Sequence, residues 1–379
     1  MENTLFCDKH ILSFLDSLAG SNKPIDLSLS HYFRFHKNLG ARDRRIIGDT
    51  IFGIFRWRGL LDHLCPSSDN AKRLSAYRGI SWESLENALS IPEFARFGMS
   101  EFMYGRFISI FGTEQAQALC RLLNTTAPVS IRANLLKTTR EELMGKLSEK
   151  FSFSPSSRAP AGIQFNKREP LFSLPEFKEG LFEVQDEGSQ LVALLVQAKP
   201  GDLVLDYCSG SGGKTLAFAP SMQKKGQIFL TDIRPNALLE ARRRLRRAGV
   251  ENAQCLPLEH PQLLRLKEKC DWVLIDVPCS GTGTFRRNPE QKWKVDAPMI
   301  GRLITQQREI ARDAIPYLKT GGRLVYATCS LLPEENQAQV DFLLSQHPLS
   351  LENEPLSIMP EPQGMDGFFA AVFRKKTVC

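Results

Sequence analysis

The chain has 379 residues, of which 42% are hydrophobic and 24% are charged, and its formal net charge is +7. A chain of this length is too long to fold around one ordinary hydrophobic core, so we expect a globular protein of two or three domains. The sequence has no apolar run long enough to span a bilayer and no signal-peptide pattern at its N-terminus, which argues against membrane and secreted classes. The basic excess fits a polyanionic partner, although many other enzymes share it.

The nine cysteines include no C-x-x-C pair, so a zinc site and a thioredoxin-like motif have no support. Without a signal peptide, cysteines in this number indicate reduced thiols and a cytoplasmic protein. We also expect no bound metal, and we expect a monomer because the sequence has no additional apolar element to bury between subunits.

The N-terminal part, residues 1–124, is predicted to be helical. Apolar residues recur at helical spacing in residues 43–64 and again in residues 101–124. Arginines, among them Arg44 and Arg45, interrupt the first apolar stretch. Composition alone favours solvated arginines on a helix bundle, and an RNA-docking module is the alternative.

A small α/β domain is predicted for residues 125–180. Residues 130–134 have the pattern of a short strand, and residues 138–150 that of a helix that a threonine caps. A loop rich in serine, proline and alanine follows at residues 155–160.

From residue 181 to residue 379, strands and helices alternate, which predicts a doubly wound parallel sheet. The expected strands are residues 203–208, 227–233, 271–277 and 323–328, and the expected helices are residues 236–247 and 300–318, the latter ended by Gly321 and Gly322. In such a sheet, ligands bind at the carboxyl ends of the strands.

The segment DYCSGSGGKT, at residues 206–215, follows the first of these strands. Its glycines allow a sharp turn and the close approach of a ligand. A P-loop would need a glycine at the position of Cys208. A nucleoside cofactor needs an acid after the next strand to bind the ribose hydroxyls, and Asp232 has that position. The residues favour a nucleoside cofactor such as S-adenosylmethionine over a nucleoside triphosphate.

Two further strands end in cysteine motifs, Asp276-Val277-Pro278-Cys279-Ser280 and Thr328-Cys329-Ser330. A lone cysteine in a core is usually inert, but two at neighbouring strand ends indicate chemistry. A thiolate that adds to C6 of cytosine makes C5 nucleophilic, which is covalent catalysis. Asp276 could supply a proton or hydrogen bond to N3 and accept one from the amino group of the base. The target base would have to leave its stack to enter such a site.

These motifs resemble those of the Fmu/Sun (RsmB-like) family of RNA (cytosine-5) methyltransferases, and most closely its member for 16S ribosomal RNA. The similar segments are EVQDEGSQ at 183–190, DYCSGSGGKT at 206–215, TDIRPNALLEARRRLRRAG at 231–249, DVPCSGTGTFRRNPEQKW at 276–293, YATCSLLPEEN at 326–336 and DGFF at 366–369. The resemblance implies a Rossmann-like class I methyltransferase fold. It also implies a NusB-like domain at residues 1–124 and a small RNA-binding subdomain at residues 125–180.

The resemblance assigns roles to individual residues. Cys329 matches the nucleophile, Cys279 the cysteine that assists product release, and Asp276 the carboxylate beside the cytosine and the cofactor. The expected S-adenosylmethionine contacts are Cys208, Ser209, Gly210, Ser211, Gly212, Gly213, Lys214, Asp232, Asp276 and Glu259. The loop departs from the family's usual C-A-A-P-G-G-K, and Glu259 is the acid nearest to the position where the family places one beside the adenine.

For RNA, the resemblance to a NusB-like domain favours phosphate contacts by Arg44 and Arg45. Arg286 and Arg287 follow the Cys279 loop beside the expected cleft, and their position also favours phosphate contacts. The substrate it implies is 16S ribosomal RNA or a precursor of the small subunit. Three alternatives are the same chemistry on tRNA, a non-catalytic RNA-binding factor for ribosome assembly, and a P-loop nucleotidase, which would explain neither cysteine motif.

Overall fold

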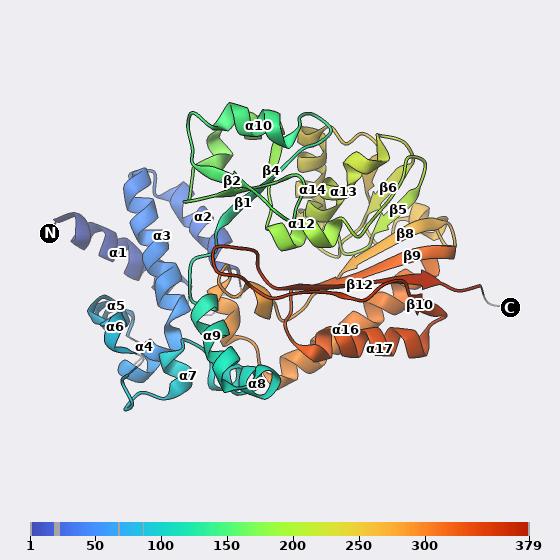
Figure 1. Ribbon diagram of the computed structural model, residues 1–379. Helices are drawn as coiled ribbons and strands as arrows, with labels where there is room; N and C mark the ends of the chain where they lie inside the picture. The colour runs from blue at the N-terminus through green and yellow to red at the C-terminus, as the bar shows by residue number, and fades with distance from the viewer. Residues whose placement is uncertain (1, 19–22, 67–68, 86, 378–379) are drawn as a thin grey trace. The chain divides into compact units, whose positions relative to one another are not determined.

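The chain forms two compact units in the computed structural model, which describes residues 2–18, 23–66, 69–85 and 87–377 (Figure 1). The helical unit comprises residues 1–126 and Thr284–Met299, and the sheet unit comprises Ala127–Gly283 and Ile300–Cys379. The structure differs from the predicted division because Thr284–Met299 groups with the helices and not with residues 181–379. None of the helices in the described ranges is both long and apolar enough to cross a bilayer.

Helices make up the N-terminal part of the helical unit, as the apolar spacing predicts. Their bounds are α1 Glu2–Ser17, α2 Ile25–Phe35, α3 Ala41–Arg56, α4 Arg58–Leu64, α5 Asn70–Gly79, α6 Trp82–Leu85, α7 Glu93–Arg96, α8 Glu101–Phe111 and α9 Thr113–Leu123. On α3, Ile47, Ile51 and Ile54 pack against Ile11 and Phe14 of α1, which anchors one core of the unit. Whether this unit is NusB-like stays a prediction.

Two of the predicted helices are broken in the structure. Trp57 has a non-helical conformation (φ −110°, ψ 20°), so the helix predicted over 43–64 is divided into α3 and α4. Gly112 has φ 78°, a value that favours glycine, and it separates α8 from α9 within the helix predicted over 101–124. Hydrophobic spacing continues across both breaks, and therefore it gave no sign of them.

The second segment of the helical unit, Thr284–Met299, contains a short 3-10 helix, Pro289–Trp293. Lys292 is fully buried, and its ammonium donates to the backbone oxygens of Arg56 (3.2 Å) and Gly98 (3.1 Å). The indole N–H of Trp293 donates to the backbone oxygen of Phe55 at 2.6 Å. The segment thus satisfies carbonyl groups around the end of α3.

An antiparallel sheet of order β2-β3-β1-β4 opens the sheet unit. Its strands are β1 Val129–Ala133, β2 Phe153–Pro155, β3 Gly162–Phe165 and β4 Phe182–Val184, with the helices α10 Arg140–Leu147 and α11 Pro175–Lys178. Thr139 caps α10 by accepting from the amide of Glu142, whose carboxylate accepts from the amide of Thr139. This agrees with the predicted threonine cap, one residue later than the predicted helix start.

A larger sheet of order β10-β12-β9-β8-β5-β6-β7, with β11 beside β12, carries the predicted strand ends. Its strands are β5 Leu203–Asp206, β6 Gln227–Leu230, β7 Ala253–Cys255, β8 Cys270–Asp276, β9 Leu318–Thr328, β10 Leu349–Leu351, β11 Leu356–Ile358 and β12 Phe368–Lys375. The accompanying helices are α12 Glu187–Ala193, α13 Gly213–Phe218, α14 Pro235–Ala248, α15 Pro261–Leu264, α16 Ala297–Ala314 and α17 Gln337–Gln346. The core residues of α13 and α14 pack on one face of the sheet, and those of α16 and α17 pack on the other (Figure 1).

This sheet is mixed, which corrects the prediction of a wholly parallel sheet. The strands β7, β6, β5, β8 and β9 run parallel, but β12 is antiparallel to β9, β10 and β11. Parallel neighbours need a crossover connection, whereas β11 and β12 are joined by a short loop and therefore pair as a hairpin.

Gly321 and Gly322 lie inside β9, and they do not end the helix that we predicted over 300–318. That helix, α16, ends at Ala314, and Pro316 follows it in a 3-10 turn. Gly321 has φ 76°, and a Cβ at Gly322 would lie 2.8 Å from the backbone oxygen of Cys270. The two glycines therefore accommodate the register shift between β8 and β9 at Cys270.

Candidate active site

The predicted site residues gather at the carboxyl ends of the parallel strands. The glycine loop follows β5, Asp232 follows β6, Asp276 is the last residue of β8, and Cys329 comes directly after β9. The strands β6, β5, β8 and β9 are consecutive neighbours in the sheet, so these side chains meet along one edge. This is the edge where a doubly wound fold binds its ligands.

The glycine loop is held by backbone geometry and by one carboxylate. Gly210 (φ 54°) and Gly212 (φ 76°) both have left-handed conformations, which favour glycine. A Cβ at Gly212 would lie 3.3 Å from the side chain of Leu230. Asp232 accepts a hydrogen bond from the amide of Gly210 at 2.8 Å. The predicted ribose-binding acid therefore also fixes the predicted cofactor loop.

Asp232 has a cationic neighbour in Arg234. The guanidinium donates to both carboxylate oxygens of Asp232, at 2.9 and 3.0 Å. Burial alone would raise the pKa of Asp232, but the hydrogen bonds and charge of Arg234 hold it below its usual range. Because the side chain of Arg234 is 68% exposed, a ligand that carries hydroxyl groups can displace it from Asp232.

A pocket of about 300 Å³ opens next to Asp232. Ile233, Leu239 and Leu258 supply apolar walls, and the exposed Glu259 is at its edge. The volume is at the lower limit for pockets that bind small molecules, about 300–1,000 Å³. This arrangement can hold a flat aromatic ring beside a carboxylate, as a nucleoside requires.

Lys214, predicted as part of the cofactor loop, forms an ion pair with Asp276 instead of pointing to solvent. The distance between its ammonium nitrogen and Asp276 Oδ2 is 2.5 Å. Burial alone would lower the pKa of Lys214, but Asp276 raises it above its ordinary value, with a smaller contribution from Cys329. Lys214 therefore carries a positive charge between the carboxylate and the second cysteine motif.

Asp206, which the sequence did not single out, is a buried acid below the glycine loop. Its Oδ2 accepts from the hydroxyl of Thr215 at 2.6 Å, and Oδ1 has no hydrogen-bond partner. Burial raises the pKa of Asp206 to about 7, and the negative charges of Asp276 and Asp232 add to this effect. Its place at the end of β5, in the motif itself, was the available signal.

The two cysteine motifs meet at their sulfur atoms. Cys279 Sγ lies 3.4 Å from Cys329 Sγ, and the backbone N–H of Cys329 donates to Cys279 Sγ at 3.3 Å. The hydrogen bond with Cys329 and then burial raise the pKa of Cys279 well above its ordinary value. Cys279 is thus held as a protonated thiol beside Cys329, and both side chains remain partly exposed.

A second acid that the sequence did not single out, Glu335, joins the two motifs below the sulfurs. It is fully buried, and its carboxylate accepts hydrogen bonds from Ser280 and Ser330, the residues that follow the two cysteines. Gln307 of α16 donates to the same carboxylate at 2.9 Å. The segment 326–336 was recognised in the sequence, but only the fold brings Glu335 to Ser280.

The predicted RNA-binding arginines belong to the helical unit. Arg286 is only 2% exposed, and this burial argues against the predicted phosphate contact, whereas Arg287 is partly exposed. Arg44 is also partly buried and donates to the backbone oxygen of Leu39 at 3.0 Å. Arg45 is open to solvent and lies 3.7 Å from Asp49.

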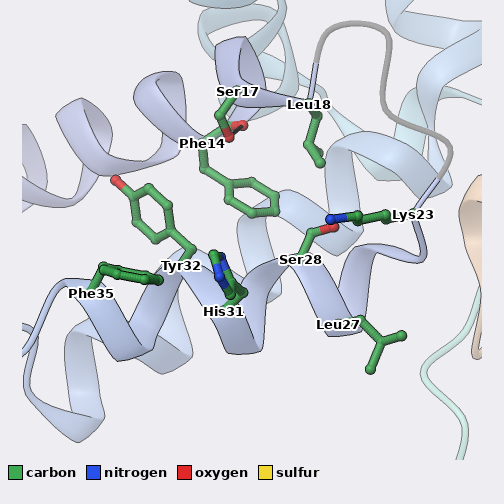
Figure 2. A pocket seen from close by; sticks show the side chains of 9 residues that line it. All are labelled: Phe14, Ser17, Leu18, Lys23, Leu27, Ser28, His31, Tyr32 and Phe35. Carbon is green, nitrogen blue, oxygen red and sulfur yellow. Dashed lines mark hydrogen bonds between the residues drawn. The ribbon is translucent and has the colours of Figure 1, made fainter. Parts of the chain in front are cut away.

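The helical unit has a pocket of its own, of about 470 Å³, between α1 and α2 (Figure 2). Aromatic and aliphatic side chains form most of its lining, and Lys23 and His31 are its only basic groups among the described residues. None of the described lining residues is a thiol or a carboxylate. This pocket is larger than the one at Asp232, and its described lining includes none of the predicted site residues.

Comparisons with known protein families identify two segments. A family model described as "16S rRNA methyltransferase RsmB/F" matches residues 193–374. A model described as "Methyltr_RsmF/B-like, ferredoxin-like domain" matches residues 99–171. The two matches cover the larger sheet and most of the small antiparallel sheet.

Similar proteins are found in distant organisms. The chain is 31% identical over 301 residues to the "Probable ribosomal RNA small subunit methyltransferase B" of Synechocystis sp.. This match covers 74% of this chain and 67% of that protein. The chain is also 32% identical over 284 residues to the "26S rRNA (cytosine-C(5))-methyltransferase nsun-1" of Caenorhabditis elegans. That match covers 72% of this chain and 42% of that protein. The chain thus matches about two thirds of the first relative's length and less of the second's.

A solved structure has a similar fold. The methyltransferase homologue from Pyrococcus horikoshii superimposes with a TM-score of 0.65 and 29% sequence identity. The match covers 74% of this chain and 97% of that protein.

Proposed function

Since the chain belongs to the RsmB/F family of 16S rRNA methyltransferases, we propose that it methylates C5 of a cytosine in small-subunit ribosomal RNA. Family membership makes the chain a methyltransferase whose cofactor is S-adenosylmethionine. The observation that carries the C5 chemistry is the pair of sulfurs, 3.4 Å apart, next to the Lys214–Asp276 ion pair. A cytoplasmic monomer that needs no metal is part of the same proposal.

The residues at the sheet edge fit the cofactor. Asp232 and the glycine loop from Cys208 to Lys214 would hold the ribose and the amino-acid part, and the pocket edged by Glu259 would take the adenine. The buried hydroxyl of Ser209 has no hydrogen-bond partner, which leaves it available to a polar ligand group. When bound, S-adenosylmethionine supplies an electrophilic methyl group.

Cys329 is the proposed nucleophile. Its thiolate adds to C6 of the cytosine, and the electron pair of the C5–C6 double bond moves so that C5 becomes nucleophilic. N3 takes up a proton from water in this step and returns it to water when the product is released. Lys214 stabilises the thiolate electrostatically. Asp276 Oδ2 is occupied by Lys214, which leaves Oδ1 to accept from the amino group of the base and so to distinguish cytosine from uracil.

Cys279 is the proposed assistant of product release. Once C5 carries the methyl group, its proton passes to solvent and the C5–C6 double bond forms again. The electrons of the C6–sulfur bond leave with Cys329, and the protonated thiol of Cys279 donates its proton to that sulfur. The raised pKa of Cys279 suits this role, because a thiol that stays protonated at neutral pH is an acid.

The test is methyl transfer from labelled S-adenosylmethionine to unmodified small-subunit ribosomal RNA, with product nucleosides identified. We expect wild-type protein to yield 5-methylcytosine, Cys329→Ala to yield none, and Cys279→Ala to accumulate a covalent protein–RNA adduct that survives denaturing electrophoresis. Cys65→Ala, which changes a cysteine of the helical unit, is the control and should behave as wild type. Methylation by Cys329→Ala would refute the nucleophile.

Two alternatives have distinct outcomes in this assay. Labelling of tRNA but not of ribosomal RNA would keep the chemistry and change the substrate. A non-catalytic assembly factor would bind RNA without any labelling, and binding of labelled S-adenosylmethionine measured alone would identify that case. Arg45 and Arg287 are the proposed phosphate contacts, since both are accessible.

A further inference from the structure

The carboxylate of Glu335 is the point where the two cysteine motifs are joined. Oε1 accepts from the backbone N–H of Ser280 at 2.9 Å, and Oε2 accepts from the hydroxyls of Ser280 and Ser330, both at 2.5 Å. The backbone oxygen of Glu335 accepts from the hydroxyl of Tyr326 at 2.7 Å. Each serine directly follows a cysteine, so one side chain sets the position of both sulfurs.

The third element tied to Glu335 is α16, through Gln307. Its amide nitrogen donates to Glu335 Oε1 at 2.9 Å and to the backbone oxygen of Pro278, the residue before Cys279, at 3.0 Å. The loop of Cys279 is therefore held on both sides of the cysteine. Gln307 itself is fully buried, so these contacts are shielded from water.

Glu335 also carries charge into the site. All of its hydrogen-bond donors are neutral: a backbone amide, a side-chain amide and two hydroxyls. Its carboxylate accepts four hydrogen bonds and so uses its full acceptor capacity. The cationic Lys214 is close enough to Cys329 for each to affect the other's ionisation. Negative charge thus acts on Cys279 and positive charge acts on Cys329.

We propose that Glu335 is a positioning residue which fixes the spacing of the two sulfurs and, by its charge, assigns the thiolate to Cys329 and the proton to Cys279. This inference rests on the proposed function, in which Cys329 attacks and Cys279 protonates the departing sulfur. Neither thiol is intrinsically different from the other, so their surroundings must decide which of them ionises. The hydrogen bond to Cys329 and burial raise the pKa of Cys279, and the charge of Cys329 and then the negative charge of Glu335 raise it further.

The experiment compares how fast iodoacetamide alkylates Cys279 and Cys329 in the free protein between pH 6.5 and 9, measured by mass spectrometry of the peptides. In wild type, we expect Cys329 to react faster. In Glu335→Gln, the charge is lost at constant size, so the pKa of Cys279 should fall and its reactivity should rise. Each unit of decrease raises the thiolate fraction about tenfold but the rate only about threefold, since a less basic thiolate is a weaker nucleophile. We expect the preference for Cys329 to fall at least about threefold.

Two further variants separate charge from geometry. Glu334→Gln makes the same substitution at the preceding residue, which is partly exposed whereas Glu335 is fully buried, and it should keep the wild-type preference. Ser330→Ala keeps the charge of Glu335 but removes one hydrogen bond to the Cys329 loop. We expect it to retain the preference for Cys329 while kcat for methyl transfer falls and KM changes little. If circular dichroism shows that Glu335→Gln does not fold, Ser330→Ala still tests the positioning role.

The outcomes are distinguishable from failure of the proposed function, because alkylation needs neither RNA nor cofactor. A wild type that alkylates at Cys279 first, or a folded Glu335→Gln with an unchanged preference, would overturn the inference. A Ser330→Ala variant with wild-type kcat would overturn the positioning role. By contrast, absence of 5-methylcytosine with an intact alkylation preference would refute the proposed function and leave the assignment of the two thiols standing.

Discussion

Asp206 has the same kind of buried carboxyl group as Glu335 but few polar partners, and we expect this to make stability depend on pH. Folding raises its pKa from an ordinary value of 3.8 to about 7, with burial as the main cause. An acid whose pKa is raised by folding contributes stability that is complete below pH 3.8 and lost as pH rises through about 7. The folded protein should therefore be penalised by this group near pH 8 and relieved of the penalty near pH 4.

Asp206→Asn tests this prediction because asparagine can still accept from Thr215 but cannot ionise. The quantity to compare is the free energy of unfolding of wild type minus that of the variant, measured by urea denaturation. We expect this difference to decrease by about 2–4 kcal/mol as the pH rises from 4 to 8. Asp202→Asn, at the other end of the strand region and partly exposed, should show no such trend. If the stability difference between wild type and Asp206→Asn stays constant with pH, the prediction that Asp206 titrates with a raised pKa is wrong.

Among single residues, those in sequence motifs were predictable and those that act through space were not. Cys279, Cys329, Asp276 and Asp232 all lie at the predicted edge because each ends or follows a strand. Glu335 was not predicted, since its partner Ser280 lies on another strand end and nothing local marks the contact. The burial of Arg286 was also missed, because a basic residue in a loop is exposed by default.

At the scale of elements, α14 links the cofactor loop to the small antiparallel sheet. Arg244 of this helix donates to the backbone oxygen of Ser211 (3.0 Å) and to its hydroxyl (2.6 Å). The same guanidinium forms an ion pair with the buried Glu183 of β4 at 3.0 Å. Serine occupies a loop position where the family usually has proline, and this contact restricts the loop in place of the proline ring.

We therefore expect Arg244→Ala to weaken binding of S-adenosylmethionine about tenfold, equivalent to about 1.4 kcal/mol, in isothermal titration calorimetry. The loop would lose two hydrogen bonds while the pocket at Asp232 stays intact. Arg243→Ala is the matched control on the same helix, since Arg243 is 78% exposed and pairs with Glu240 on the same helix. Equal affinities for the two variants would show that the glycine loop needs no support from α14.

Helices and strands were predicted best where the spacing of apolar residues is regular over the whole element. The strands β5, β6 and β8 and the helix α14 agree with the predicted ranges to within a few residues. The glycine pair of β9 was read as a helix end, because glycines after an amphipathic stretch usually have that role. In the structure, Gly322 permits the close approach of Cys270 of β8. The need for a glycine therefore comes from a residue that is far away in the sequence.

For the molecule as a whole, Lys292 is one of the residues that attach Thr284–Met299 to the helical unit. Its ammonium also donates to the side-chain oxygen of Asn124, in addition to the carbonyls of Arg56 and Gly98. Burial lowers the pKa of Lys292 well below its ordinary value, and the neighbouring charge of Arg56 adds to this. Removing the side chain would leave a cavity and three acceptors without their donor.

We expect Lys292→Ala to destabilise the helical unit by about 3 kcal/mol, from the cavity and the lost hydrogen bonds together. Hydrogen exchange should show faster exchange of amides in α3, α4 and α9, with little change in β5 and β8. Lys294→Ala, two residues later and exposed, should change stability by less than about 0.5 kcal/mol. Uniform acceleration across both units would contradict a role confined to the helical unit.

The helices of residues 1–124 were predictable, but the excursion of Thr284–Met299 was not, since it directly follows the Cys279 motif in the sequence. Composition distinguishes helical from alternating segments along the chain. It carries no information on a short segment that leaves one unit to complete another.

This excursion has a consequence for synthesis on the ribosome. Residues 1–126 emerge first, yet the segment that supplies Lys292 and Trp293 is made only after all of Ala127–Gly283. At about 5–20 residues per second, the interval is on the order of ten seconds or more. During that time the carbonyl groups at the end of α3 have no lysine to bind, so the helices of residues 1–126 wait for a segment that is translated only after most of the sheet unit.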